Sequence, residues 1–128
     1  MKNLIIDGTN DSPVINLNKD TGILYLGGSS LPENVLEVYN PVLNWLEEYL
    51  KKPHPETRAE FFFEYLNTAS SHMMVRILQQ LVQLKNVCTD FKITWFYVTG
   101  DPDMRHFGEE LMDLTGFPIQ LIARDLNF

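Results

Sequence analysis

Apolar and polar residues alternate along residues 12–28, on both sides of Asp20-Thr21-Gly22. A period of two is the pattern of a β-strand with one buried face. Gly22 adopts the positive φ of a tight turn more easily than any other residue. The pattern therefore predicts a β-hairpin at the start of the fold.

The spacing of apolar residues changes to three and four over residues 33–52, which predicts an amphipathic helix. The apolar positions are Val35, Tyr39, Val42, Leu46 and Tyr49. Pro41 interrupts this pattern, and proline inside a helix removes a backbone hydrogen bond. Because Asn40 can cap a helix that begins with proline, we predict a main helix over 41–52 behind a shorter turn.

Two strongly apolar segments, RAEFFFEYL at 58–66 and KITWFYV at 92–98, predict strands. Strict alternation in the first segment places one set of side chains on one face, namely Ala59, Phe61, Phe63 and Tyr65. Phe62 and Leu66 then lie on the other face. Apolar residues on both faces favour a central strand that is covered on both sides, or nearly so.

Two further helices are predicted, over residues 68–85 and 101–116. The apolar side of the first comprises Met73, Met74, Ile77, Leu78 and Leu81. The second begins with Asp101 as cap and Pro102 at the first helical position, and Gly116 ends it. A last short strand is expected at 117–123.

The predicted order is strand, strand, helix, strand, helix, strand, helix, strand. Strands that alternate with helices form βαβ crossovers and a parallel sheet, to which the hairpin adds an antiparallel pair. We therefore expect an α/β fold in which helices pack on a mixed sheet. No repeat or linker divides the sequence, so residues 1–128 are expected to form one domain.

Charge and composition exclude several classes of partner. Acidic residues outnumber basic residues 17 to 10, giving a net charge of −7. This balance argues against binding to nucleic acid and disfavours anionic membrane surfaces. The single cysteine, Cys88, is expected to be an inert, half-buried thiol. We expect a cytoplasmic protein, because neither a signal peptide nor a long apolar run is evident.

The sequence offers little evidence of catalysis. His54, His72 and His106 are scattered, and no serine or cysteine lies in a nucleophile motif. Asp101, Asp103 and His106 could be considered as metal ligands, but Asp101 is better explained as a helix cap. The glycine-containing stretches GTNDS and LGGSS lack the lysine of a phosphate-binding loop. We expect no metal, no cofactor and no enzymatic activity.

Small polar residues dominate the segment Asn67-Thr68-Ala69-Ser70-Ser71, where an apolar strand meets an apolar helix. A helix start can accommodate a phosphate, because its backbone N–H groups are free and carry partial positive charge. Asn67 or Thr68 could equally be only an N-cap, since such residues are common at helix starts. Position alone leaves both interpretations open.

The segments YLNTASSHMMVRIL and LPENVLEVYNPVLNWLEEYL resemble the SiaC family of bacterial regulatory phosphoproteins. The resemblance extends roughly from SPVINL to IQLIA. It implies a fold related to STAS domains, in which a partner Ser/Thr protein kinase phosphorylates a hydroxyl at a helix start. A PPM-type phosphatase removes the phosphate, and the unphosphorylated protein binds and activates a diguanylate cyclase. The resemblance places the phosphoacceptor at Thr68.

His72 and Arg76 follow Thr68 at spacings of four, so the three residues share one helix face. The expected partner-binding surface comprises Asn67, Thr68, Ser70, Ser71, His72 and Arg76. Three alternatives remain open: an anti-sigma-factor antagonist, a STAS-like module that binds a small molecule, and a small enzyme. The antagonist is disfavoured because Asn-Thr-Ala replaces the usual Asp-Ser-Ser of the wider STAS pattern.

Overall fold

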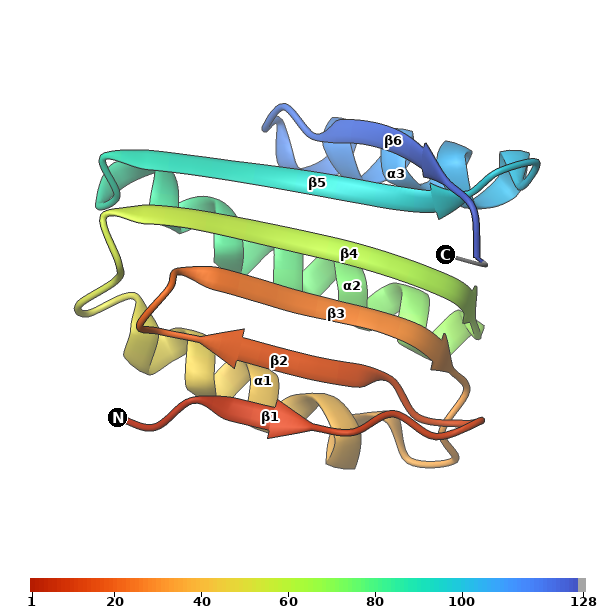
Figure 1. The fold of residues 1–128 in the computed structure, drawn as a ribbon, viewed down its shortest axis with the longest axis horizontal. Helices are drawn as coiled ribbons and strands as arrows, with labels where there is room; N and C mark the ends of the chain where they lie inside the picture. Colours follow the sequence, from red (N-terminus) through yellow and green to blue (C-terminus); the bar gives the residue numbers. More distant parts are fainter. Residues whose placement is uncertain (127–128) are drawn as a thin grey trace.

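A computed structural model describes residues 1–126 and shows one sheet covered by helices (Figure 1). The strands are β1 Leu4–Ile6, β2 Val14–Asn18, β3 Ile23–Ser30, β4 Glu56–Leu66, β5 Asp90–Val98 and β6 Gln120–Arg124. The helices are α1 Val35–Tyr49, α2 Thr68–Leu81 and α3 Pro102–Thr115, with a 3₁₀ turn, η1, at Val82–Asn86. Strands lie in the sheet in the order of the sequence, from β1 to β6. The predicted α/β fold with a mixed sheet is confirmed.

Both antiparallel pairs lie at the amino-terminal edge of the sheet. β2 and β3 form the predicted hairpin, in which Asn18 pairs with Ile23 and Gly22 has a φ of 75°. β1 pairs antiparallel with β2 and was not predicted, because the three-residue strand Leu4–Ile6 is too short to show a period. The pairs from β3 to β6 are all parallel.

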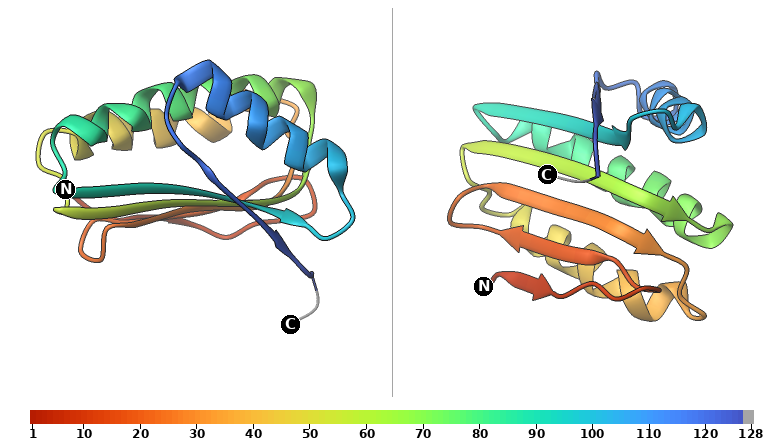
Figure 2. Two further views of the ribbon diagram at one scale, coloured as in Figure 1. Left: turned by 90° about the horizontal axis from the view of Figure 1, so that it is seen from above. Right: turned by 45° about the vertical axis from the view of Figure 1, so that its right-hand side comes forward.

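All three helices of the described chain cover the same face of the sheet, as the left view of Figure 2 shows. Successive right-handed crossovers that build a sheet in one direction place every helix on one side. The segment at 58–66 lies in β4, a central strand as predicted, but the prediction that helices cover both of its faces is wrong. Phe61 and Phe63 are buried on the helix-covered face, whereas Phe62 is only half-buried on the open face. On the open face, the guanidinium of Arg124 lies over two rings, 5.2 Å from the centroid of Phe62 and 3.7 Å from that of Phe96.

A register shift at the end of β4 corrects the predicted side-chain pattern. Gly28 pairs with Phe63, but the next residue of β3, Ser29, pairs with Tyr65. Glu64 is the extra residue of this β-bulge, and a bulge shifts the side chains that follow it. Tyr65 is therefore 54% exposed and does not join the buried phenylalanines, whereas Leu66 packs against the core.

Helix α1 continues through Pro41, so the predicted start at residue 41 is wrong. The helix begins at Val35, and the Asn34 side chain caps it by accepting a hydrogen bond from the Glu37 N–H at 3.2 Å. Pro41 lies on the exposed side of α1, while Tyr39 and Val42 on either side are fully buried. Burial of these neighbours offsets the missing hydrogen bond, because tertiary packing overrides local propensity.

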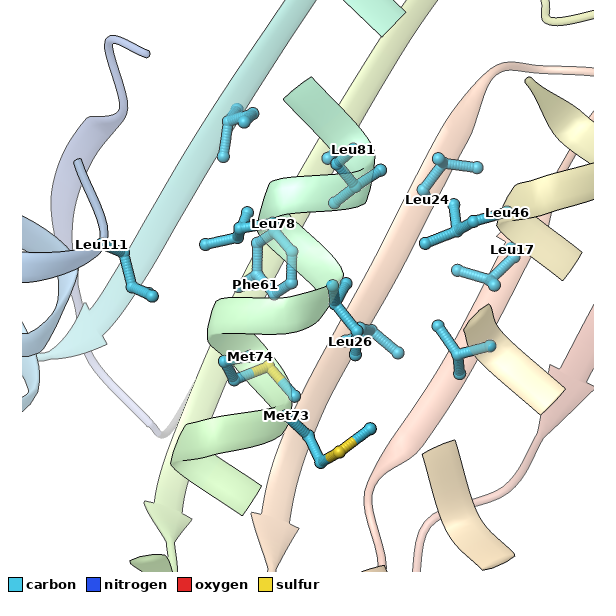
Figure 3. Packing of buried hydrophobic residues seen from close by; sticks show 14 of the residues in the cluster. Leu17, Leu24, Leu26, Leu46, Phe61, Met73, Met74, Leu78, Leu81 and Leu111 are labelled. Atoms are coloured by element: carbon cyan, nitrogen blue, oxygen red, sulfur yellow. The ribbon is translucent and has the colours of Figure 1, made fainter. Parts of the chain in front are cut away.

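The other two helices agree closely with the sequence prediction. All five predicted apolar residues of α2 are buried, and Figure 3 shows Met74 and Leu78 beside Phe61. The α-helix ends at Leu81, and η1 continues it to Asn86. Helix α3 begins and ends as predicted, with the Asp101 carboxylate accepting from the Met104 N–H at 3.1 Å and Gly116 in a left-handed conformation.

Trp95 of β5 anchors α3 to the sheet. Its ring is fully buried between Phe61 and Phe63, and its Nε1–H donates to the Met104 carbonyl at 3.0 Å. Gly108 of α3 lies so close that a Cβ there would stand 2.6 Å from Cδ1 of Trp95. Glycine is therefore required at this position for α3 to approach the sheet.

Candidate functional site

Thr68 lies at the end of the sheet that is formed by the carboxyl ends of the parallel strands. β4 ends at Leu66, Asn67 follows, and Thr68 is the exposed first residue of α2. In α/β folds, groups at the carboxyl ends of parallel strands form the usual functional sites. The hydroxyl of Thr68 is therefore at a position that a partner protein can reach.

Asn67 fixes the start of α2 through both its side chain and its backbone. Its Oδ1 accepts a hydrogen bond from the Ser70 N–H at 2.8 Å, and its carbonyl accepts from the Ser71 N–H at 2.9 Å. Its own N–H donates to the Ser30 carbonyl at 2.9 Å. Asn67 is thus the N-cap, which leaves Thr68 free of the capping role.

Ser70 lies in the interior and not on the expected partner-binding surface. Its side chain is fully buried, and its Oγ lies 2.8 Å from Oγ of Ser30. The Ser30 Oγ in turn lies 2.6 Å from the hydroxyl of Tyr39 on α1. Burial raises the pKa of Tyr39 to about 12, against the opposing effect of its hydrogen bonds to the serines. We therefore remove Ser70 from the partner-binding surface, since a partner cannot contact a fully buried side chain.

The remaining predicted residues form an exposed ridge along α2. Thr68, His72 and Arg76 are exposed, and Asn67 and Ser71 are half-buried. The Arg76 Nη1 group lies 3.8 Å from Sδ of Met73, one turn earlier on the same helix. The helix thus presents hydroxyl, imidazole and guanidinium groups along one line, starting at Thr68.

A surface hollow flanks each side of this ridge. One of about 400 Å³ lies toward α3 and is lined by Glu64, Tyr65, Leu66, Ser71, Asp101, Asp103, Met104 and Phe107. The other, of about 370 Å³, lies toward α1 and is lined by Asn40, Leu43, Asn44, Glu47, Arg76, Gln79 and Gln80. Carboxylates supply all the formal charge of the first lining, so a phosphate on Thr68 would add negative charge beside an acidic hollow.

The candidate metal ligands have other roles in the fold. Asp101 caps α3, and Nε2 of His106 lies 3.1 Å from the Glu110 carboxylate. Within residues 1–126, no cluster of three or more His, Cys, Asp or Glu side chains is arranged to hold a metal ion. Cys88 is half-buried, with its Sγ 3.4 Å from the His54 carbonyl. Asp101, His106 and Cys88 therefore each have a partner within the fold.

Two other hollows bear on the small-molecule alternative. The larger, of about 500 Å³, lies at the opposite end of the sheet from Thr68 and is lined by Met1, Lys19, Glu48, Lys51, Lys52, Pro53 and His54. The apolar hollow between α1, α2 and the sheet measures about 10 Å³ and holds at most about one water molecule. In the part of the chain that the structure describes, no helix is both long and apolar enough to cross a membrane.

Sequence reasoning missed the contribution of Ser30 and Tyr39 to this site. Tyr39 appeared only as one apolar position of a helix, and Ser30 lies 38 residues before Thr68 in the sequence. One signal was present: a tyrosine in the apolar stripe of a helix needs a buried partner for its hydroxyl. The identity of that partner depends on the tertiary fold.

Comparison with known proteins gives consistent matches over nearly the whole chain. A family model described as SiaC family regulatory phosphoprotein matches residues 6–124. An uncharacterized protein of Pseudomonas aeruginosa strain UCBPP-PA14 is 29% identical over 125 residues, which cover 98% of this chain and 99% of that protein. The structure of SiaC of Pseudomonas aeruginosa matches with a TM-score of 0.84 at 28% identity, covering 97% of this chain and 100% of SiaC.

A second structural match shows a relative together with a partner. It is a chain of the crystal structure of the diguanylate cyclase SiaD in complex with its activator SiaC, from the same species. The TM-score is 0.85 at 28% identity, and the match covers 94% of this chain and 99% of that chain.

Proposed function

Because the chain belongs to the SiaC family of regulatory phosphoproteins, we propose that it is a phosphorylation switch that controls a diguanylate cyclase. The unphosphorylated protein binds and activates the cyclase, and phosphorylation of Thr68 ends this interaction. A Ser/Thr protein kinase adds the phosphate and a PPM-type phosphatase removes it. The chain itself is the substrate of these enzymes and has no catalytic role.

The observation that carries this proposal is the exposed hydroxyl of Thr68 at a capped helix start. Phosphorylation transfers the terminal phosphoryl group of ATP to Oγ1, releases the hydroxyl proton and leaves ADP. It adds about −1.5 to −2 charges and three acceptor oxygens at one point. Free N–H groups of the first turn favour this charge, so the fold tolerates the modification. A partner bound at the same point does not tolerate the added phosphate if it packs closely there or presents acidic groups.

The ridge of Thr68, His72 and Arg76, with Ser71 beside it, is the proposed contact surface for the cyclase. A known SiaC activates the diguanylate cyclase SiaD and forms a complex with it, and this chain shares the fold of SiaC over almost its full length. Side chains of a partner could enter the hollows on either side of the ridge, which would increase the buried contact area.

A calorimetric titration against the SiaD-type cyclase of the organism that encodes the chain tests this proposal. Four forms are compared: wild type, wild type carrying phosphothreonine at position 68, Thr68→Ala and Thr68→Glu. We expect wild type and Thr68→Ala to bind equally well, because Asn67 still caps α2. The phosphorylated form should bind at least about thirtyfold more weakly, since an unpaired charge in an interface costs about 2–5 kcal/mol.

Thr68→Glu should lose part of the affinity, because one carboxylate copies a phosphate dianion poorly. Thr21→Glu is the matched control. Thr21 is also an exposed threonine, but it lies in the hairpin turn before β3, at the end of the sheet opposite to Thr68. This variant should bind like wild type. Equal affinity of the phosphorylated and unphosphorylated proteins would refute the switch, whatever the mutants do.

A further inference from the structure

Ser30, the last residue of β3, makes three hydrogen-bonding contacts, two with the start of α2 and one with α1. Its carbonyl accepts from the Asn67 N–H at 2.9 Å. Its Oγ lies 2.8 Å from Oγ of Ser70 and 2.6 Å from the hydroxyl of Tyr39. All three hydroxyl-bearing residues have no exposed surface. A single buried residue therefore joins β3, α1 and the first turn of α2.

These contacts fix residues on both sides of Thr68 in the sequence. Asn67 precedes it and Ser70 follows two residues later, and both are bound to Ser30 and to each other. Thr68 between them is exposed. The backbone that carries the exposed hydroxyl is thus fixed by half-buried Asn67 and by fully buried Ser30 and Ser70.

We propose that Ser30, Tyr39 and Ser70 are positioning residues for the phosphorylation of Thr68. Their hydroxyl network holds the first turn of α2 in the geometry that the kinase recognises. This inference rests on the proposed role of Thr68. Phosphoryl transfer depends on placing the acceptor oxygen in line with the leaving group, so a loosened turn slows the reaction even when the acceptor is intact.

Tyr49 of α1 supplies a matched control for Tyr39. Its hydroxyl lies 2.8 Å from Oγ1 of Thr57, and both residues are buried, as Tyr39 and Ser30 are. The contact is at the other end of α1, near the start of β4 and far from Thr68. Tyr39→Phe and Tyr49→Phe therefore each delete one buried hydroxyl from the same helix, but only the first deletion affects the turn of Thr68.

The first experiment measures amide hydrogen exchange of the full-length, unphosphorylated proteins. Loss of one buried hydrogen bond raises the equilibrium constant for local opening about tenfold. We expect the amides of Ser70 and Ser71, which donate to Asn67, to exchange about tenfold faster in Tyr39→Phe than in wild type, and at the wild-type rate in Tyr49→Phe. Ser70→Ala should reproduce the effect of Tyr39→Phe. Equal exchange rates in the two tyrosine variants would show that the hydroxyl network does not stabilise this turn, whether or not Thr68 is a phosphoacceptor.

The second experiment measures phosphorylation in a mixture. Equal amounts of the two tyrosine variants, one of them labelled with ¹⁵N, react with ATP in an extract of the organism that encodes the chain. While conversion is low and a phosphatase inhibitor is present, the ratio of phosphorylated Thr68 given by mass spectrometry equals the ratio of the two kcat/KM values. We expect Tyr39→Phe to react about three- to tenfold more slowly than Tyr49→Phe.

A ratio of one, combined with faster exchange in Tyr39→Phe, would overturn the positioning role. Phosphorylation at another residue in the wild type would instead refute the proposed function and leave the exchange result as the measure of the network. The two failures are therefore distinguishable.

Discussion

Truncating Phe63 and Phe62 separately should show that only one face of the sheet is covered. Phe63 has no exposed surface and lies 6.1 Å, between ring centroids, from Trp95. Removing its ring loses about 1.5–3 kcal/mol of hydrophobic stabilisation, and the cavity left behind costs about 2 kcal/mol more. We expect Phe63→Ala to lower the free energy of unfolding by about 3–5 kcal/mol.

Phe62 is the neighbouring residue on the same strand and carries the same side chain on the open face. It is half-buried, and its contacts there are the Phe96 ring at 6.2 Å and the Arg124 guanidinium at 5.2 Å. Because solvent and flexible groups can close over the gap, Phe62→Ala should cost only about 1–2 kcal/mol.

Urea denaturation followed by far-UV circular dichroism measures both changes at one temperature. Phe63→Leu serves as a milder variant if Phe63→Ala does not fold, and it should cost about 1–2 kcal/mol. Equal losses for Phe62→Ala and Phe63→Ala would refute the one-sided arrangement, because they would require an equally close-packed layer on both faces.

Three further outcomes are expected. Arg76→Glu should weaken binding to the cyclase about tenfold and leave the melting temperature unchanged, because Arg76 is exposed on the proposed ridge; unchanged affinity would exclude this helix face from the interface. Gly108→Ala should lower the free energy of unfolding by about 1–2 kcal/mol in a urea titration, because contact with Trp95 outweighs the gain in helix propensity. Folding raises the pKa of Tyr39 from 10.0 to about 12, so the stability it contributes is complete below pH 10 and is lost as the pH rises toward 12. Between pH 9 and 11, wild type should therefore lose about 1 kcal/mol more than Tyr39→Phe, and parallel pH profiles would contradict this assignment.

Sequence periodicity was sufficient to predict the elements that pack most regularly. The apolar stripe of α2 and the Asp101–Gly116 boundaries of α3 follow from local rules and agree with the structure. The position of Thr68 at a helix start was predicted for the same reason, since the N-cap signal lies next to it in the sequence.

The errors arise where a distant part of the chain decides the outcome. Pro41 lies inside α1 because burial of its neighbours outweighs the break it would otherwise cause. Tyr65 is exposed because β3 pairs with β4 through a bulge, and strict alternation cannot reveal a bulge. Ser70 was placed on the surface because no local pattern shows that Ser30 lies beneath it.

Strand order in this sheet coincides with sequence order, from β1 to β6. Each new strand that leaves the ribosome therefore finds its neighbour already synthesised, and no strand must insert between two others. Assembly can proceed from the amino-terminal hairpin outward, with each helix closing over the pair of strands that it connects. Parallel pairing is intrinsically slow because each crossover closes a long loop, but this strand order keeps every pairing between strands that are neighbours in the sequence. The hydrogen-bonding network that holds the turn of Thr68 comes from β3, α1 and α2, so all its members are synthesised before β5 and β6.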